Sequence, residues 1–357
     1  MKRSVRTRQV KYLIISVVCM CWCAIIIAQK EVVEISREKN ENKINIFIGH
    51  KLFTSFLYPD SLEKPVLYPI FASNGTRITR GFPLHLYPGE PTDHPHHIGL
   101  WLTFENVNGL DFWNNSYAIP PEKKHLYGWI RTDHILQTSG GVKGILSYHA
   151  NWTDQKHKVL LEETTRFEFS GTPHHRTIDR ITSLKADTDI LFTDAKDGML
   201  GLRVARELQI PSATDQKFTD DKGNITIVKK IDDSLATGNY LTSEGKQGDD
   251  AWSTRAVWCK MYGKMGKDSI SITIIDHPGN PNYPTFWHAR GYGLFAANPL
   301  GEKIFTNGKS EKNLHLKKGE SVQFYYRILI DDGKNTVTAT QLNKMANEFA
   351  RMDASRE

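Results

Sequence analysis

The stretch Ser269-Ile-Ser-Ile-Thr-Ile-Ile275 decides the fold class, because large apolar residues alternate in it with small polar ones. Successive side chains of an extended strand point to opposite faces of a sheet, so this alternation predicts a strand with one buried face. The same period of two recurs in other segments, which include Thr165, Phe167 and Phe169 and the series Val322, Phe324, Tyr326, Ile328 and Ile330. An all-β fold is therefore predicted.

The segments between these strands favour turns, since Gly, Pro, Asn and Ser recur in them, as in Ser139-Gly-Gly141. We therefore expect a large antiparallel β-sandwich of jelly-roll or supersandwich type with long loops, in which residues 212–248 form an excursion or long hairpin. One segment departs from this pattern. Apolar residues at three- and four-residue steps predict a C-terminal helix at about residues 337–352, with Thr338 or Thr340 as its N-cap.

The N-terminal residues predict export from the cell. Basic residues precede the apolar run Tyr12 to Ala28, and a small residue ends it, which is the pattern of a secretory signal peptide. We therefore expect a signal peptide at residues 1–28, a single β-sandwich catalytic domain at residues 29–357, and a periplasmic or secreted protein. The alternative is a single-span N-terminal membrane anchor, for which the apolar run is just long enough.

Charge and cysteine content exclude some classes of partner and crosslink. The formal net charge is +6, and the basic residues before the apolar run account for nearly all of it. The remainder lacks the surplus of Lys and Arg that nucleic-acid binding needs, so we expect no nucleic-acid partner and no membrane contact beyond the export signal. After cleavage Cys259 is the one remaining cysteine, which predicts a buried structural thiol and no internal disulfide. An oligomeric state does not follow from the sequence.

Three of the 14 histidines lie within four positions, at the end of Glu90-Pro-Thr-Asp-His-Pro-His-His97. Two prolines in this stretch exclude a regular helix, so we expect an extended loop that leads into a strand at residues 98–104. Alternation along an extended chain then places His94 and His96 on one face and His97 on the other. We call residues 94–97 the histidine loop.

The histidine loop has three interpretations. His94 and His96, completed by Glu90 or Asp93, could bind a divalent metal such as zinc. A histidine could instead transfer a proton near neutral pH. In the third interpretation the histidines only hold the loop through hydrogen bonds to the backbone. We predict His97 as a catalytic residue and Glu90, His94 and His96 as substrate-binding residues, with metal binding left open.

A second polar motif is Pro284-Thr-Phe-Trp-His-Ala-Arg-Gly-Tyr-Gly-Leu-Phe295. Taken as one strand, it places His288, Arg290 and Tyr292 on one face at intervals of about 6 to 7 Å, and small residues on the other. A base, a permanent cation and a phenol suit β-elimination beside a carboxylate, because proton loss builds enolate-like charge that a guanidinium neutralises. The structural alternative is that Arg290 pairs with a carboxylate on a neighbouring strand and His288 belongs to the core.

Aromatic and acidic residues near the histidine loop are weaker candidates. Trp101 and Trp113 are candidate platforms for a sugar ring and Asp111 is a candidate polar contact to it, although aromatic residues at such spacing usually belong to a core. Further histidines that could join the site are His134, His149 and His277.

Four motifs, in this order, resemble an exported bacterial family usually labelled methane oxygenase PmoA. They are Glu90-Pro-Thr-Asp-His-Pro-His-His-Ile-Gly-Leu-Trp101, Val107-Asn-Gly-Leu-Asp-Phe-Trp113, Asp197-Gly-Met-Leu-Gly-Leu-Arg-Val-Ala205 and Trp287-His-Ala-Arg-Gly-Tyr-Gly293. The label does not fit this chain, since a membrane methane monooxygenase subunit needs several spanning helices and the sequence has at most one apolar run. The resemblance, over about residues 67–331, implies an oligosaccharide dehydratase in the breakdown of uronate-containing polymers such as ulvan.

The residues and the resemblance together predict a carbohydrate-active dehydratase or lyase that eliminates water from the non-reducing terminal uronate of an oligosaccharide. His97, His288, Arg290 and Tyr292 are its predicted catalytic residues. A non-catalytic glycan-binding protein is one alternative, in which aromatic platforms hold the sugar. A glycoside hydrolase is another, but its candidate carboxylates stand at spacings that form no evident pair. These carboxylates are Glu90, Asp93, Glu105 and Asp111.

Overall fold

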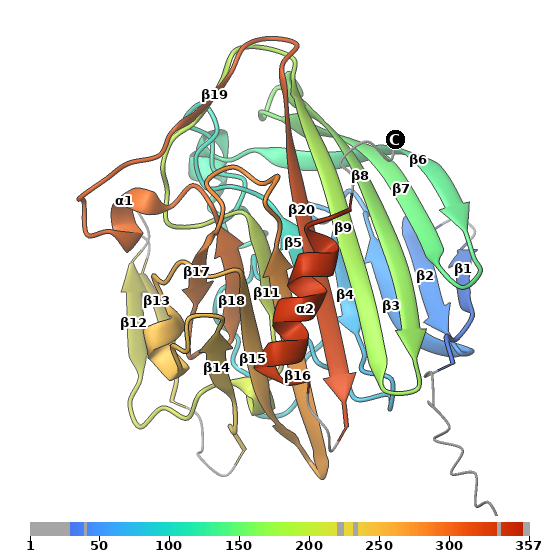
Figure 1. Cartoon of the computed structure of the whole chain (residues 1–357). Coiled ribbons are helices and arrows are strands. Elements are labelled where there is room, and N and C mark those ends of the chain that lie inside the picture. The colour runs from blue at the N-terminus through green and yellow to red at the C-terminus, as the bar shows by residue number, and fades with distance from the viewer. Residues whose placement is uncertain (1–28, 39–40, 220–224, 231–234, 334–336, 353–357) are drawn as a thin grey trace, which may run out of the picture.

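Two antiparallel sheets of eight strands each form most of the protein (Figure 1). The structure is a computed structural model that describes residues 29–38, 41–219, 225–230, 235–333 and 337–352. The predicted signal peptide at residues 1–28 lies outside the described residues. The all-β fold, as a large antiparallel sandwich with long loops, is confirmed.

The two sheets combine strands that are distant in sequence. The first sheet contains, in spatial order, β1 (Val33–Arg37), β2 (Lys43–Ile48), β3 (Lys51–Leu57), β4 (Val66–Ile70), β5 (Leu100–Leu102), β11 (Leu200–Arg203), β18 (Leu294–Asn298) and β17 (Phe286–Ala289). The second sheet contains β14 (Asn239–Thr242), β15 (Trp258–Met265), β16 (Asp268–Asp276), β20 (Ser321–Asp332), β9 (His175–Ala186), β8 (Val159–Thr172), β7 (Gly144–Thr153) and β6 (Trp129–Ser139).

Short elements connect and flank the two sheets. Two further strand pairs are β10 (Ile190–Phe192) with β19 (Leu314–Leu316) and β12 (Gln216–Thr219) with β13 (Ile225–Val228). The helices are α1 (Glu302–Phe305), α2 (Ala339–Phe349) and the 3-10 turns η1 (Pro121–Leu126), η2 (Arg206–Leu208) and η3 (Gly248–Ala251). Because β12 pairs antiparallel with β13, the excursion predicted at residues 212–248 does contain a hairpin.

The alternating segments have the predicted burial. Ile270, Ile272 and Ile274 of β16 are fully buried in the core between the sheets. In the register of the sheet Ile272 faces Ile330 and Ile274 faces Ile328 of β20, so two alternating sequences pack side by side. Such cross-strand pairs of branched residues are the main source of stability within a sheet.

The inner face of the second sheet also holds a buried ion pair. Arg180 Nη2 donates to Glu163 Oε1 at 2.9 Å, and the two side chains are 2% and 0% exposed. Tyr148 Oη donates to the same oxygen at 2.6 Å, and Trp152 Nε1 donates to Oε2 at 2.8 Å. Both carboxylate oxygens therefore have donors, which offsets the cost of removing the charges from water.

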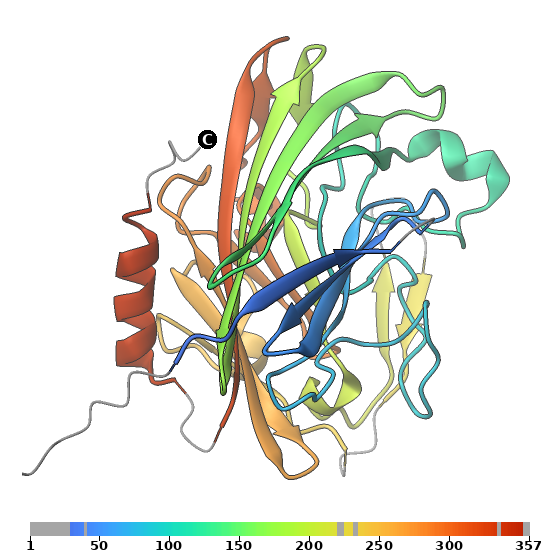
Figure 2. The same cartoon turned by 90° about the vertical axis from the view of Figure 1, so that its right-hand side faces the viewer.

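The predicted C-terminal helix is α2, which is shorter than the expected residues 337–352 and begins after Thr338, one of the two expected N-caps. The Thr338 hydroxyl accepts from the Gln341 backbone and the Gln341 side chain returns to the Thr338 backbone, which completes a capping box. Leu342, Ala346 and Phe349 are buried in a cluster with β15, β16 and β20 residues. The helix thus covers the outer face of the second sheet, opposite the first sheet (Figure 2).

Two predicted strands are wrong in extent. The strand expected at residues 98–104 is limited to β5, and the motif at residues 284–295 is a hairpin of β17 and β18 instead of one strand. The chain reverses because Gly293 adopts a φ of +89° and its N–H donates to the Arg290 carbonyl at 2.9 Å. A positive φ is easily reached by glycine, and it closes the turn here.

Two other predictions concern cysteine and the membrane. Cys259 is fully buried in β15 and has a free thiol, as predicted. Within the described part of the chain no helix has the length and apolar character needed to cross a membrane.

Candidate functional site

The candidate site lies on the face of the first sheet that points away from the second sheet. On β5, Leu100 and Leu102 belong to the core between the sheets, so Trp101 between them points to the opposite face. The same alternation on β11 sends Leu202 inward and Arg203 outward, where its guanidinium lies over the Tyr292 ring. The strands β5, β11, β18 and β17, which run from the middle of the first sheet to one edge, therefore support the site from below.

A pocket of about 540 Å³ opens on this side of the sheet. The segments before and after β5, the segment before β11, the β17–β18 hairpin and β13 all contribute to it. It combines imidazoles, two cations, a carboxylate and a phenol. The lining residues are His94, Pro95, His96, His97, Asn114, Ser116, Ala118, Ile119, Pro120, Lys196, Asp197, Ile225, Thr226, His288, Arg290 and Tyr292.

The histidine loop is a turn, which corrects the expectation of an extended chain with two faces. His94 has a φ of +43°, and the His97 N–H donates to the His94 carbonyl at 3.0 Å. All three rings therefore meet on one side of the chain. The His94 and His97 rings stack with centroids 4.7 Å apart, and the His96 ring lies edge-on to His97 at 4.2 Å.

A buried arginine holds this turn. Arg80, whose side chain is 0% exposed, donates to the backbone carbonyls of Asp93 at 2.6 Å, His94 at 2.8 Å and His97 at 3.1 Å. The planar guanidinium has enough donors to bind several carbonyls at once. The backbone of the histidine loop is therefore fixed from behind, which leaves its side chains to line the pocket.

Asp93 fixes the orientation of the His94 ring. Its Oδ2 accepts from His94 Nδ1 at 2.6 Å, and both its oxygens accept from Arg203 Nη2, at 3.0 and 2.7 Å. Burial opposes the negative charge of Asp93, but Arg203, the His94 hydrogen bond and Arg80 hold its pKa well below its usual value. A permanent carboxylate thus selects the His94 tautomer with the proton on Nδ1.

The predicted sugar platforms lie behind the pocket. Trp101 stacks on His97 with centroids 5.3 Å apart, and Trp113 meets the same ring edge-on at 6.0 Å. Both indoles are 0% exposed and neither lines the pocket. Asp111 is also buried and accepts from the backbone N–H groups of Trp113 and Asn114, each at 2.9 Å. These residues therefore support His97 and the loop after β5.

Glu90 lies apart from the pocket lining. Its Oε1 accepts from Arg77 Nη2 at 2.9 Å, and its Oε2 accepts from the Gly81 N–H at 2.6 Å. The carboxylate is almost fully buried in these contacts. Glu90 therefore anchors the chain that leads to the histidine loop.

The β17–β18 hairpin brings the three residues of the second motif into the pocket. His288 is 1% exposed, and its Nδ1 lies 3.4 Å from Asp197 Oδ1, while neither ring nitrogen makes a well-aligned hydrogen bond within the described residues. The Arg290 guanidinium lies over the Trp252 ring at 4.9 Å. The Tyr292 ring is parallel to that of His94 at 5.1 Å. The turn therefore brings His288, Arg290 and Tyr292 to one pocket, as the predicted single strand was expected to do.

Burial sets the protonation states in the pocket. It lowers the pKa of His94 to about 4, although Asp93 opposes the shift. It also lowers the pKa values of His96, His97 and His288 well below their usual range, and nearby ionisable groups add to the effect. These imidazoles are therefore uncharged at neutral pH, and one of them can act as a base only where a nearby carboxylate compensates the charge that it gains.

The Tyr292 phenol has the opposite role. Burial raises its pKa far above 10, although Arg203 and Arg290 partly oppose the shift. The phenol therefore keeps its proton and can donate it.

Sequence reasoning missed Lys196 and the site role of Asp197. Lys196 Nζ lies 3.5 Å from Asp197 Oδ2, and the Asp197 N–H donates to Glu105 Oε2 at 3.0 Å. Burial opposes the charge of Lys196, but Asp197 and Glu105 outweigh it and raise the pKa of the ammonium. Asp197 is the first residue of one of the four motifs quoted above, and this position was the sequence signal that could have identified it as a site residue.

No histidine of the histidine loop belongs to a group of closely spaced ligand atoms in the part of the chain that the structure describes. Among the described residues, one group of three or more ligand atoms lies within 4.8 Å of one another, and it consists of Asp133, His134 and His149. This group belongs to β6 and β7 and not to the pocket lining. Metal binding by the loop stays a prediction.

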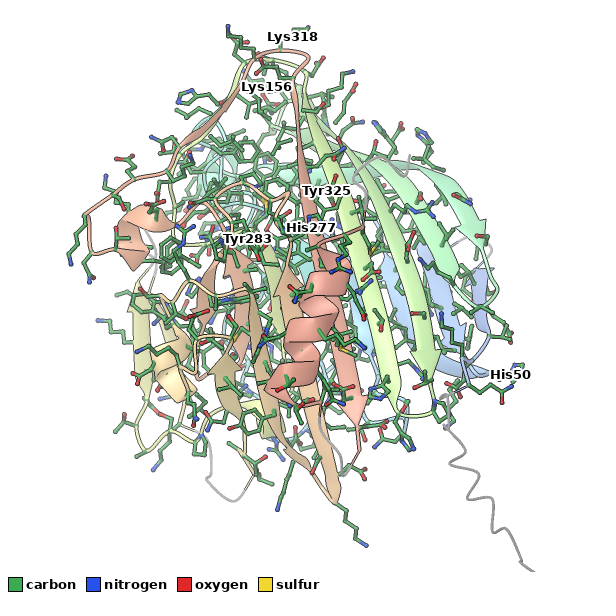
Figure 3. All side chains as sticks on the ribbon, viewed as in Figure 1. His50, Lys156, His277, Tyr283, Lys318 and Tyr325 are labelled. Atoms are coloured by element: carbon green, nitrogen blue, oxygen red, sulfur yellow. The ribbon has the colours of Figure 1, made fainter. Side chains whose placement is uncertain are left out.

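His277 also lies elsewhere. Its ring packs against Tyr325 at 4.9 Å and against Phe349 of α2 at 5.0 Å, and Figure 3 shows it beside Tyr325 on the helix-covered side. It therefore supports the docking of α2.

Comparisons with solved structures give distant likenesses. The GH36 α-galactosidase AgaB from Geobacillus stearothermophilus is 10% identical, with a TM-score of 0.37, over 85% of this chain and 41% of that one. Slr1438 from Synechocystis sp. PCC 6803 is 9% identical, with a TM-score of 0.32, over 84% and 95%. A galactose mutarotase related enzyme from Lactobacillus acidophilus is 10% identical, with a TM-score of 0.31, over 85% and 98%. The chain thus spans less than half of the α-galactosidase.

Sequence comparison identifies the family. No curated protein matches the sequence. The model of DUF6807, described as a family of unknown function, matches residues 43–347. Since this is most of the sequence, the chain belongs to the DUF6807 family.

Proposed function

We propose that this protein is an exported carbohydrate-active dehydratase, which eliminates water from the non-reducing terminal uronate of an oligosaccharide such as those released from ulvan. One observation carries the proposal. Two cations, Lys196 and Arg290, line the same pocket as uncharged imidazoles and the protonated phenol of Tyr292. The motif resemblance to polysaccharide-degrading systems supports the same substrate class.

The two cations suit the carboxylate of the substrate. A guanidinium offers two parallel N–H groups to a carboxylate, and the indole of Trp252 backs the Arg290 guanidinium. Lys196 adds a second positive charge from the opposite segment, before β11. Loss of the proton next to the carboxylate creates an enolate-like dianion, which such cations stabilise in a partly closed pocket. We assign carboxylate binding to Arg290, with Lys196 as its partner.

His288 is the proposed base. Its imidazole is uncharged because of burial, and Asp197 at 3.4 Å stabilises the imidazolium once it forms. In the proposed step His288 takes the proton from C5 of the uronate. The electron pair of that bond forms the C4–C5 double bond as the bond between C4 and its hydroxyl breaks.

Tyr292 is the proposed acid. It donates its proton to the departing hydroxyl, which leaves as water, and a 4,5-unsaturated sugar remains. A proton then returns from His288 to Tyr292 by way of solvent, so the cycle balances. His94 and His97 lie on the Tyr292 side of the pocket, with ring centroids 5.1 and 6.5 Å from its ring. We assign them to this proton transfer.

The pocket rim suits a substrate longer than one sugar. Ser116 and Ala118 line the pocket, and Tyr117 between them is 64% exposed. An exposed aromatic ring beside a sugar pocket can stack on the next sugar of the chain. We assign this contact to Tyr117.

The two alternatives have less support. A glycoside hydrolase needs two carboxylates at the scissile bond. Among the described lining residues Asp197 is the one carboxylate, while Asp93 and Asp111 are engaged by Arg203 and by backbone N–H groups. A binding module needs neither the buried imidazoles nor the acid. Binding of sugar without turnover would favour it.

The decisive experiment follows ultraviolet absorbance while the purified protein acts on uronate-terminated oligosaccharides. A new carbon–carbon double bond conjugated to the carboxylate absorbs there. The same assay with a chelator tests for metal dependence, and His288→Gln is compared with His315→Gln on the exposed part of β19. A rise that His288→Gln abolishes supports elimination, whereas products without this absorbance would favour hydrolysis.

The export proposal has its own test. The protein is recovered from the producing cells, and its N-terminal residues are sequenced. A mature chain that starts near residue 29 supports a cleaved signal peptide, whereas an intact N-terminus in the membrane fraction would support the anchor.

A further inference from the structure

A second cluster of ligating side chains lies on the outer face of the second sheet, away from the pocket. Asp133 and His134 are consecutive in β6, and His149 is in the neighbouring strand β7. Tyr148 next to His149 points into the core, so His149 points outward by strand alternation. Their ligand atoms all lie within 4.8 Å of one another.

An irregularity in strand pairing brings the three side chains together. His134 pairs directly with His149, and Thr132 pairs with Ala150, so Asp133 is an extra residue in β6. Such a β-bulge changes the direction of side chains along the bulged strand. Without the bulge, Asp133 and His134 would point to opposite faces. The bulge therefore places two consecutive ligands on the same side as His149.

The separations are close to those of tetrahedral coordination. Asp133 Oδ2 accepts a hydrogen bond from His134 Nδ1 at 2.8 Å, which a bound ion would replace, and lies 3.5 Å from His149 Nδ1. Ligand atoms at the usual zinc distances of about 2.0 to 2.1 Å are about 3.3 Å apart in a tetrahedron. His149 Nδ1 is shielded from solvent and makes no well-aligned hydrogen bond within the described residues. A shielded nitrogen that faces a carboxylate and a second imidazole has the surroundings of a ligand.

We propose that Asp133, His134 and His149 bind a late first-row divalent metal ion, with zinc as the best fit. Two imidazoles and one carboxylate form a ligand set that zinc prefers, and solvent supplies the fourth position at this exposed site. β6 is the edge strand of the second sheet, so the ion joins the edge to β7. The proposal is independent of the function assigned to the pocket.

The test measures zinc binding at neutral pH by calorimetric titration of the intact protein with zinc sulfate. We expect His149→Gln to lose one equivalent of bound zinc, or to bind it at least about tenfold more weakly, compared with the wild type. His50→Gln is the matched control, because His50 is an exposed histidine that pairs with one carboxylate, Glu34 at 2.7 Å, and belongs to no group of three ligands among the described residues. This control should bind zinc as the wild type does.

A stability measurement gives an independent readout. Zinc should raise the melting temperature of the wild type and of His50→Gln, because a ligand that binds only the folded state stabilises it. The rise should be lost in His149→Gln and in His134→Gln, two exposed or half-exposed positions. Equal isotherms and equal melting shifts for all four proteins would overturn the proposal, since any zinc would then bind elsewhere.

Discussion

The ring of Tyr292 lies parallel to the ring of His94, with centroids 5.1 Å apart and planes 1° apart. The two residues come from the β17–β18 turn and from the histidine loop, which are distant in sequence. Arg203 connects them, because its guanidinium lies over the Tyr292 ring and also binds Asp93, the partner of His94. These contacts involve the Tyr292 ring, so a substitution that removes only the hydroxyl group keeps them.

Tyr292→Phe tests the proposed acid. The variant keeps the stacked ring and removes the hydroxyl, so we expect turnover to fall about 10²- to 10⁴-fold with little change in melting temperature. The measurement is the rate of double-bond formation. Tyr283→Phe, on the loop before β17, is the control and should keep full turnover (Figure 3). Full activity in Tyr292→Phe would remove this residue from the mechanism.

Arg290→Lys and Arg290→Met separate charge from geometry. Lys keeps the positive charge but lacks the paired N–H groups of a guanidinium, so it should retain part of the activity on uronates. Met keeps the stem and loses the charge, and we expect a further loss of kcat/KM. If both variants matched the wild type, the carboxylate would have to bind elsewhere in the pocket.

Acid should destabilise the protein through the pocket histidines. The pKa of His94 is about 4 in the folded protein and 6.5 in the unfolded chain, so only the unfolded chain binds a proton between these values. The free energy of unfolding should therefore fall as pH decreases from about 6.5 to 4, by about 3 kcal/mol for this residue. His94 should contribute no pH dependence above that window.

Urea unfolding at several pH values between 7.5 and 4.5 checks this prediction. His94→Gln removes the titrating group, so its unfolding free energy should depend less on pH than that of the wild type. Parallel profiles for the two proteins would mean that His94 does not titrate in this way.

The buried pair of Arg180 and Glu163 should be costly to break. Arg180→Met leaves the Glu163 carboxylate buried without its cation, and we expect a loss of about 3 to 5 kcal/mol in unfolding free energy. The double variant Arg180→Met with Glu163→Leu removes both charges and should recover much of this loss. Denaturant unfolding of the three proteins measures the effect, and a double variant no better than Arg180→Met would contradict it.

Tyr117→Ala tests the pocket rim. If this ring stacks on the second sugar, the variant should show a higher KM for uronate-terminated oligosaccharides and an unchanged kcat. The exposed Leu136→Ala on β6 serves as the control. An unchanged KM would limit recognition to the terminal sugar.

The sequence predicted the elements whose signals are local. Alternation identified β16 and β20, because one face of each is buried, and one of the two predicted N-caps, Thr338, starts α2. His288, Arg290 and Tyr292 were grouped correctly because a short turn keeps neighbours together. The prediction of a single strand was wrong because Gly293 allows a turn, which an alternating residue pattern does not reveal.

The remaining site residues depend on contacts between distant segments. Lys196 stands before β11, which β18 separates from β17 in the sheet, and only the folded chain brings it into one pocket with His288. Trp101 and Asp111 have the composition of a sugar site, yet their burial assigns them to supporting the loops. Exposure and long-range pairing decided these roles, and neither is encoded in the spacing of residues along the chain.

The support of the pocket by core strands has a consequence for how the protein loses activity. His288 lies between Trp287 and Ala289, both of which are fully buried between the sheets. A local opening that released His288 would therefore also expose core side chains, so we expect this opening to cost nearly as much as global unfolding. Heat should then inactivate the protein in the same cooperative transition that melts its sheets.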